Sequence, residues 1–447
     1  MDGRCLFQGA PPFFIGQGPT PQDWPRAFVP SRVGPARVGP SGGLAGKLPS
    51  PSDRLALKSS LAAELGLPPF RARFPWWGPD LQTLRDTLRT AAPGPDPGEP
   101  VLTEVGQGDQ LLSFLDRPLD QQVDQRAHQP LETRSHRSLN QPQGAGAELG
   151  QAKGLVLVLH GLGGSSQAPG VRRLGQVLQR NGFAVLRPNL RGAGPSRPFA
   201  RGSYAAQCNR DLLPLLAQAR RLAEGRPLLA VGLSLGGTVL LNGCLAEDPL
   251  GSPSPSPGAL PRLDGLACVS SPLDLVACSA QIDQPRNRLY QRWLLQRLHQ
   301  QVRGEVRADA PDGWDGGPGG PAPTIRSFDA QITAPRWGYP SVDAYYAEAS
   351  PLARLLQGGP GLGPGLPPSL WLQASDDPWV PAGGTEALGA ALAHAQTTWA
   401  PIHENSAVLI TPGGGHNGFH GQGDPGSASW SDRLVLAWLA RLVGGAD

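Results

Sequence analysis

The sequence predicts an α/β protein in which helices cover both faces of a mostly parallel sheet. Short, continuous apolar runs of the kind that form buried parallel strands recur along the chain. Stretches with apolar residues at helical spacing lie between these runs. This alternation of strand and helix favours parallel strands joined by crossover helices.

The strands are expected where apolar residues follow one another without interruption. Leu155–Leu159 has the pattern of a strand that is buried on both faces. The later strands are predicted, in chain order, at Phe183–Leu186, Leu228–Gly232, Leu263–Val269, Leu370–Gln373 and Ala407–Ile410.

The helices are expected between these strands and on either side of them. Residues 170–180 place Val171, Leu174, Val177 and Leu178 on one helical face. Further helices are predicted at Asp80–Arg89, Asp211–Leu222, Gly236–Leu245 and Ser431–Leu442.

Glycine and proline are unusually abundant, with 60 and 50 residues among 447. They show no regular period, which argues against a collagen-like or repeat protein. They concentrate in stretches that we interpret as linkers or exposed loops, namely residues 1–50, 118–154, 251–258, 311–323 and 358–368. We therefore expect residues 1–69 to be a disordered or loosely attached extension, and residues 70–447 to form the folded domain.

Charge and cysteine content limit the class of protein. The net charge is +3 without a dense Lys/Arg block, so we expect no nucleic-acid partner. The five cysteines form no C-x-x-C pair, which argues against a zinc site or a disulfide framework and favours a reducing compartment. No apolar run approaches the roughly 20 residues that span a bilayer, and no signal peptide is recognisable. The expected location is the cytoplasm.

Ser234 is the candidate nucleophile, in a G-x-S-x-G motif from Gly232 to Gly236. Ser41 lies in a second match, but no strand precedes it and no helix follows. The motif around Ser234 joins the apolar run Leu228–Gly232 to a predicted helix, and this arrangement predicts a sharp turn that raises the serine above the sheet.

Two loops supply candidate donors for an oxyanion. The loop that starts at His160 follows the first buried strand, and a helix begins directly after Ser234. We therefore assign the backbone N–H groups of Leu162 and Leu235 as donors. His160 precedes Ser234 in the chain, whereas the base follows the nucleophile in this fold, so we interpret His160 as structural.

The acid and the base are expected after the last two predicted strands. Asp376 and Asp377 follow Leu370–Gln373, and the offset to Val380-Pro381 favours Asp377 as the acid, with Asp376 as the alternative acid. If Asp377 is the acid, Asp376 is expected to brace the turn. His416 follows Ala407–Ile410 in a glycine-rich loop and is the candidate base. His420 is the rival for that role. Gly418, between the two histidines, argues against a helical metal-binding pair.

These motifs resemble those of the YheT-like esterase family, which is related to eukaryotic alpha/beta-hydrolase-domain phospholipases and yeast medium-chain ester synthases. The likeness extends from about Phe74 to the C-terminus, and Ser270–Arg297 is its most family-specific part. It includes residues 80–83, 160–165, 189–192, 232–237, 288–292, 328–329, 376–378 and 414–419. Asp80 stands where the family usually has His.

The resemblance implies an alpha/beta-hydrolase fold with a helical cap insertion at about residues 273–356. Within the cap, Tyr290, Trp293, Leu294, Leu295 and Leu298 stand at helical spacing. This stripe either packs the interior of the cap or lines an acyl pocket, and both interpretations remain open.

The function expected from these residues is carboxylic-ester hydrolysis through an acyl-enzyme, on short- to medium-chain acyl esters or lipids as small-molecule or lipid substrates, with no cofactor or metal implied. Two alternatives stay open: transfer of the acyl group to an alcohol, and a non-catalytic scaffold.

Overall fold

The computed structural model describes residues 61–88, 98–119, 149–246, 262–302, 322–357, 366–394 and 406–444. All of them belong to one compact unit, Ser50–Asp447. The predicted division at residue 70 stays a prediction, because residues 1–60 lie outside the described part of the chain. Leu61, Ala62 and Leu67 are already buried against the core. Most residues of the predicted linkers also lie outside the described ranges.

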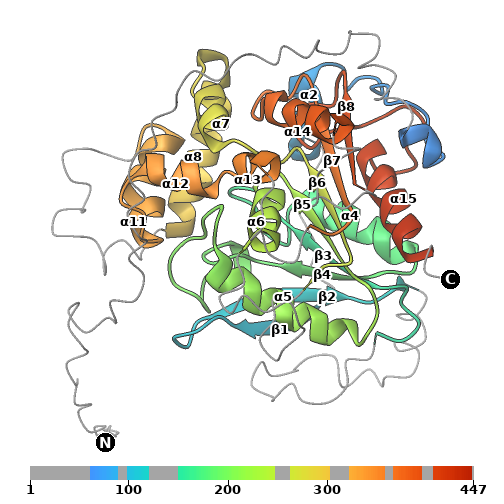
Figure 1. Ribbon diagram of the computed structural model, residues 1–447, viewed down its shortest axis with the longest axis horizontal. Helices are drawn as coiled ribbons and strands as arrows, with labels where there is room; N and C mark the ends of the chain where they lie inside the picture. The colour runs from blue at the N-terminus through green and yellow to red at the C-terminus, as the bar shows by residue number, and fades with distance from the viewer. Residues whose placement is uncertain are drawn as a thin grey trace, which may run out of the picture. The chain divides into compact units, whose positions relative to one another are not determined.

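The scaffold is an eight-stranded sheet with the order β1-β2-β4-β3-β5-β6-β7-β8 (Figure 1). β2 pairs antiparallel with both β1 and β4, and the pairs from β4 to β8 are parallel. The strands are β1 (Glu99–Glu104), β2 (Gln110–Asp116), β3 (Leu155–Leu159), β4 (Ala184–Pro188), β5 (Leu228–Leu233), β6 (Gly265–Val269), β7 (Ser369–Ala374) and β8 (Ala407–Thr411). The mostly parallel sheet predicted from the sequence is confirmed.

Helices cover both faces of this sheet (Figure 1). α5 (Asn209–Ala223) and α6 (Leu235–Cys244) lie on one face, and α4 (Pro169–Arg180) and α15 (Trp430–Gly444) pack together on the other. The alternation of side chains along β3 divides the core accordingly. Leu155, Leu157 and Leu159 join the apolar cluster under α5 and α6, whereas Val156 and Val158 join the cluster under α4 and α15.

A helical insertion occupies the chain between β6 and β7, as the resemblance implied. Its helices gather beyond the edge of the sheet in Figure 1. They are α7 (Leu275–Ile282), η3 (Pro285–Asn287), α8 (Arg288–Val302), α10 (Ile325–Phe328), the π-helical turn η4 (Asp329–Thr333), α11 (Ala334–Arg336), α12 (Val342–Ala349) and α13 (Leu352–Gln357). The cap has an apolar cluster of its own, in which Leu294, Leu295 and Leu298 pack against Phe328.

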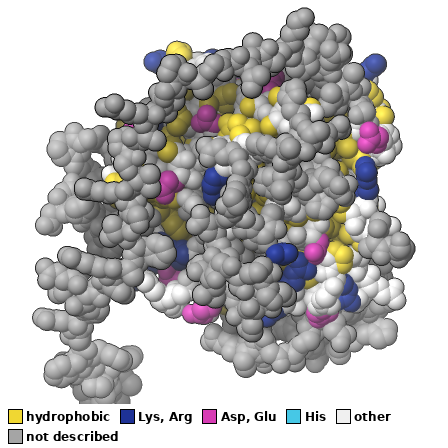
Figure 2. All heavy atoms as spheres, viewed as in Figure 1, with side chains coloured by type: hydrophobic (Ala, Val, Ile, Leu, Met, Phe, Trp, Pro, Cys, Tyr) yellow, Lys and Arg dark blue, Asp and Glu magenta, His cyan; other side chains and the backbone are white. Residues whose placement is uncertain are grey.

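Two further helices complete the unit. α2 (Pro79–Leu88) lies close to the predicted range, and α14 (Gly383–His394) lies between β7 and β8. Within the described residues no helix is long and apolar enough to cross a membrane. On the face seen in Figure 2, acidic and basic side chains are interspersed wherever described residues are visible, without a field of one sign.

Candidate active site

Ser234 stands at the turn between β5 and α6, with φ 53° and ψ −127°. A positive φ is uncommon for a residue with a side chain and is typically retained at functional turns. Glycine is required on both sides of this turn. A Cβ at Gly236 would lie 2.5 Å from the carbonyl oxygen of Leu159, and one at Gly232 would lie 2.2 Å from the backbone of Gly237. The predicted strand–turn–helix geometry is therefore present.

The structure brings His416 and Asp377 to Ser234. Nε2 of His416 lies 2.9 Å from the Ser234 hydroxyl, and Nδ1 lies 2.9 Å and 3.2 Å from the two carboxylate oxygens of Asp377. Asp377 is buried and also accepts hydrogen bonds from the backbone N–H groups of Trp379 (2.8 Å) and Val380 (3.0 Å). Because a carboxylate only accepts, the proton of the imidazole is assigned to Nδ1, and Nε2 accepts from the hydroxyl.

Asp376 takes the bracing position that was its predicted alternative role. Its carboxylate accepts a hydrogen bond of 2.9 Å from the N–H of Gly415, in the loop that carries His416. Burial raises the pKa of Asp376, although the hydrogen bond from Gly415 opposes the shift. The adjacent carboxylates thus have different partners: Asp377 the imidazole, and Asp376 the backbone of the loop.

His420, the rival base, faces away from the nucleophile. Its Nδ1 accepts a hydrogen bond of 2.8 Å from Arg85, and its backbone N–H donates to Gln82 at 2.7 Å. Burial lowers the pKa of His420, and the neighbouring Arg173 and Arg85 lower it further. His420 is therefore held neutral in a structural network.

The two candidate oxyanion donors lie on either side of Ser234. Leu235 is the first residue of α6, so its N–H has no hydrogen-bond partner within the helix. It lies at the N-terminal, positive end of the helix dipole. Leu162 follows Gly161, and a Cβ at Gly161 would lie 2.9 Å from the Cβ of Ser234. The peptide that leads to Leu162 is therefore in close contact with the nucleophile.

The loop that carries Leu162 is held in place by two side chains. The Tyr204 hydroxyl accepts from the N–H of Gly163 at 2.8 Å and donates to the carbonyl of Gly161 at 3.1 Å. His160 Nδ1 donates to the same carbonyl at 2.8 Å, while its Nε2 accepts from the N–H of Leu190 at 3.2 Å. Burial lowers the pKa of His160 to about 4, with the Gly161 hydrogen bond opposing the shift. This neutral, doubly bonded ring fits the structural role expected of His160.

α2 positions the histidine loop, a contribution that the sequence did not reveal. Thr83 Oγ1 accepts the N–H of His416 at 2.9 Å and donates to the carbonyl of Pro79 at 2.7 Å. Gln82 is buried and bonds both the N–H and the carbonyl of His420, at 2.7 Å and 3.1 Å. In the sequence, only the motif at residues 80–83 pointed to this contribution, and the residues of the histidine loop that it contacts lie more than 300 residues away.

Trp379 lies between the histidine and helix α8 of the cap. Its ring lies 4.4 Å from that of His416, centroid to centroid, at an angle of 31°. On its other side it contacts Tyr290 and Trp293 of α8, at 5.3 Å and 6.3 Å. A residue two positions after the acid thus packs the imidazole against the cap.

Ser234 and His416 open into a cavity of about 280 Å³ between the sheet and the cap. Its walls are mainly apolar and include Leu162, Leu233, Leu275, Ile282, Leu294, Leu298 and Phe328. The α8 stripe therefore does both things considered from the sequence, because Leu294 and Leu298 belong to the cap core and also line the cavity.

One carboxylate lies in the wall of this cavity without a basic partner among the described ion pairs. Asp329 accepts hydrogen bonds from the hydroxyls of Thr333 (2.7 Å) and Tyr346 (2.8 Å). Burial raises the pKa of Asp329 to about 6, although both hydrogen bonds oppose the shift. Asp329 is thus a buried acid whose pKa lies above that of an exposed aspartate.

Comparison with known proteins places these observations in a family context. The model of the alpha/beta hydrolase family matches residues 155–444, which include Ser234, Asp377 and His416.

Similar curated proteins include a phospholipase, an ester synthase and an esterase. Phospholipase ABHD3 of Mus musculus is 28% identical over 289 residues, which cover 64% of this chain and 64% of that protein. Medium-chain fatty acid ethyl ester synthase/esterase 2 of Saccharomyces cerevisiae is 30% identical over 224 residues, 45% of this chain and 48% of that protein. Putative esterase YheT of Escherichia coli is 29% identical over 240 residues, 52% and 63% of the respective chains. Each match spans less than two thirds of the relative's own length.

Proposed function

The chain belongs to the alpha/beta hydrolase family, and from that membership we propose that it is a serine carboxylic-ester hydrolase. One observation carries the proposal. The Ser234 hydroxyl, the His416 imidazole and the Asp377 carboxylate form a continuous hydrogen-bonded series with separations of 2.9 Å and 2.9 Å. A hydroxyl, a neutral imidazole and a buried carboxylate in this order are what acyl transfer to serine requires.

In the proposed reaction the Ser234 oxygen attacks the ester carbonyl as its proton passes to Nε2 of His416. Asp377 holds Nδ1–H and stabilises the imidazolium that forms. The N–H groups of Leu162 and Leu235 bind the oxyanion, and each such donor typically contributes about 10²–10³ in rate. The tetrahedral intermediate then expels the alcohol, which takes the proton from His416. Water attacks the acyl-enzyme by the reverse sequence and releases the acid.

The cavity favours short- to medium-chain acyl esters. Its volume of about 280 Å³ lies just below the range for small-molecule sites, which begins at roughly 300 Å³. The apolar walls from Leu233, Leu294 and Leu298 suit an alkyl chain better than a charged acid. Such a site accepts a soluble ester or a single chain of a lipid ester.

Transfer of the acyl group to an alcohol is the second candidate, favoured by one relative that is named an ester synthase as well as an esterase. Both outcomes share the acyl-enzyme on Ser234. Incubation with a p-nitrophenyl ester in the presence of ethanol separates them, because formation of the ethyl ester would show that the alcohol competes with water.

The proposal is tested with Ser234→Ala, which is expected to lower turnover of p-nitrophenyl butyrate by at least roughly 10⁴-fold. A fluorophosphonate probe should label the wild-type chain and not this variant. Ser41→Ala is the matched control, because Ser41 lies in the second G-x-S-x-G match. Labelling that persists in Ser234→Ala, or that disappears in Ser41→Ala, would contradict the assignment.

A further inference from the structure

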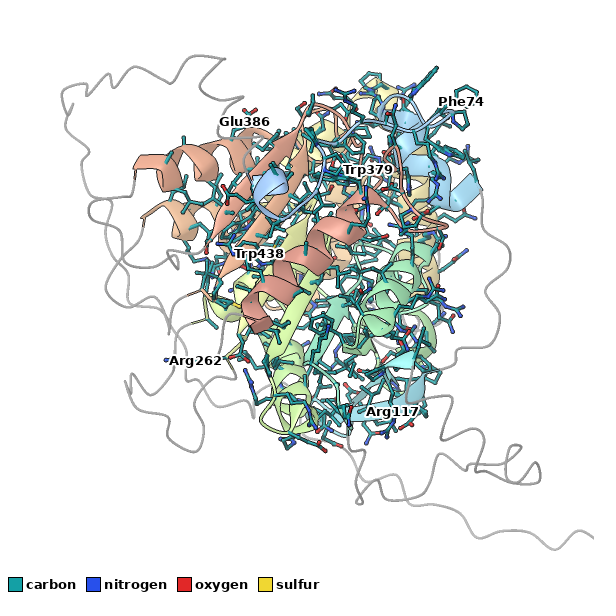
Figure 3. The ribbon with its side chains drawn as sticks, turned by 90° about the vertical axis from the view of Figure 1, so that its right-hand side faces the viewer. Phe74, Arg117, Arg262, Trp379, Glu386 and Trp438 are labelled. Carbon is teal, nitrogen blue, oxygen red and sulfur yellow. The ribbon has the colours of Figure 1, made fainter. Side chains whose placement is uncertain are left out.

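Large apolar side chains project into solvent from two neighbouring segments of the described structure. We name this set the apolar rim. It consists of Phe74, Trp77, Leu81, Leu289 and Trp293. Leu289 is 81% exposed, Phe74 71% and Trp77 60%, and Phe74 projects outward in Figure 3. Single exposed apolar residues are ordinary, whereas a group of them marks an interaction site.

The two segments that carry the apolar rim are joined by hydrogen bonds between polar residues next to it. The rings of Phe74 and Trp77 lie 5.2 Å apart, just before α2. At the start of α2, Asp80 accepts hydrogen bonds from the Tyr290 hydroxyl at 2.9 Å and from Arg286 at 3.2 Å. These bonds hold the beginning of α2 against the beginning of α8. The rim therefore forms one surface across the two helices.

The apolar rim is continuous with the wall of the cavity. Leu289 and Trp293 are four residues apart on α8, so they share one side of the helix. Trp293 is exposed at the surface, and it also lines the cavity together with Trp379. One side chain of the rim, Trp293, is therefore also part of the wall of the cavity that contains Ser234.

Exposed basic side chains outnumber acidic ones in the two segments that carry the rim. In residues 71–88 and 283–297 the exposed cationic residues are Arg71, Arg286, Arg288, Arg292 and Arg297, and the exposed anionic residues are Asp80 and Asp283. The Arg297 guanidinium also stacks on the Trp293 ring at 4.3 Å. Indole rings bordered by arginines suit the boundary between lipid and water, where the ring enters the apolar layer and the cation meets anionic head groups.

We propose that the apolar rim docks on an anionic lipid bilayer, from which an ester lipid enters the cavity. This proposal names the source of the substrate for the proposed function. It rests on that function for the hydrolysis of the lipid. A membrane surface fits better than a folded partner, because Trp293 of the rim also lines the apolar cavity and exposed cationic side chains outnumber anionic ones in the two segments that carry the rim.

Sedimentation with vesicles tests this proposal in the full-length Ser234→Ala chain, which cannot hydrolyse the lipid. This background is expected to bind vesicles of phosphatidylcholine mixed with phosphatidylserine. Adding Trp77→Ser and Leu289→Ser should weaken that binding by roughly tenfold or more, because two large apolar side chains no longer enter the bilayer. Adding Arg288→Gln and Arg292→Gln should weaken it by roughly tenfold on the mixed vesicles but not on phosphatidylcholine alone.

The matched charge control is Arg180→Gln with Arg221→Gln. These residues lie in the last turns of α4 and α5, on crossover helices whose C-terminal ends face the opposite edge of the sheet from the site. This pair should leave vesicle binding unchanged. With Ser234 intact, the Trp77/Leu289 variant should hydrolyse soluble p-nitrophenyl butyrate at the wild-type rate. If it fails to fold, Leu289→Ser alone provides the test, because its side chain is almost fully exposed.

Absence of vesicle binding by the Ser234→Ala chain would overturn the proposal, as would equal binding by the rim variant. If light scattering shows a dimer that the rim variant loses, while no form binds vesicles, the rim is a self-association surface and the proposal is wrong. Loss of esterase activity alone would leave vesicle binding intact, so failure of the proposed function and failure of the docking surface are distinguishable.

Discussion

Thr83→Val removes the hydroxyl through which α2 holds the histidine loop while keeping the shape of the side chain. In the native structure this hydroxyl accepts the N–H of His416 at 2.9 Å. His416 is buried, so its N–H would lose its partner without gaining water. An unsatisfied buried donor costs about 1–3 kcal/mol.

That cost applies to the loop arrangement that places the His416 imidazole on Ser234. Since 1.4 kcal/mol corresponds to a factor of ten, the ratio of the competent to the displaced loop arrangement should fall by roughly 5- to 150-fold. We expect kcat for p-nitrophenyl butyrate to fall by up to this factor with little change in KM, because valine keeps the shape of the Thr83 side chain, which lies in the cavity wall. The rate of fluorophosphonate labelling of Ser234 should fall in parallel.

Thr83→Ser is the matched control, because it keeps the hydroxyl and removes only a methyl group. It should retain near wild-type kcat. The reasoning is wrong if Thr83→Val retains full activity, or if Thr83→Ser is impaired to the same extent. Urea denaturation of both variants separates a local effect on the loop from a loss of global stability.

Three further perturbations address the acid, the nucleophile turn and the buried carboxylate of the cap. Asp377→Asn should lower kcat by about 10⁴-fold, because the imidazole loses the partner that fixes its tautomer. Asp376→Asn should lower kcat by at most about tenfold. Kinetics with a p-nitrophenyl ester compare the two variants. Gly236→Ala forces a Cβ to within 2.5 Å of a backbone oxygen, so it should lower the free energy of unfolding by about 1–3 kcal/mol and also lower turnover. In the control Gly383→Ala the new Cβ meets nothing within 4 Å, so stability and turnover should both be unchanged. Urea denaturation and ester assays measure the two effects. Asp329 has a pKa raised from 3.8 to about 6 by burial, so the folded state holds its proton more tightly than the unfolded state. Stability should therefore fall by up to about 3 kcal/mol as pH rises from about 4 to about 6 and then level off, and urea titrations of Asp329→Asn should lack this decline.

The elements that the sequence predicted best are those defined by local pattern. β3 and β5 are uninterrupted apolar runs. The sharp turn after β5 was predictable from its flanking glycines, at which a Cβ would clash with the backbone. The two strands at the antiparallel end of the sheet, β1 and β2, were not predicted. β1 mixes Glu, Pro and Thr with two apolar residues, and β2 places Gln, Ser and Asp in a short run. Their strand character comes from pairing with each other and with β4, which no local pattern records.

The residues of the candidate site likewise fall into those that local pattern predicted and those that depend on contacts between distant segments. Ser234, Asp377 and His416 each follow a strand, so parallel strand ends predicted their proximity. Trp379 and Tyr204 act through contacts with segments far away in the chain, and no spacing rule identifies such contacts. The choice between Asp376 and Asp377 likewise depends on which carboxylate faces the imidazole.

The position at which this chain departs from the related family, Asp80, can be understood from the way α2 distributes its contacts. Asp80 and its partner Arg286 are 54% and 46% exposed, and an ion pair so exposed contributes about 0–1 kcal/mol. Gln82 and Thr83, by contrast, reach inward to the buried loop of His416 and His420. A change at residue 80 therefore alters how α2 meets the cap at the apolar rim, whereas the hydrogen bonds that position the imidazole are made two and three residues later. We therefore expect Asp80, in place of the histidine that the resemblance implies, to leave the chemistry proposed for Ser234 undisturbed.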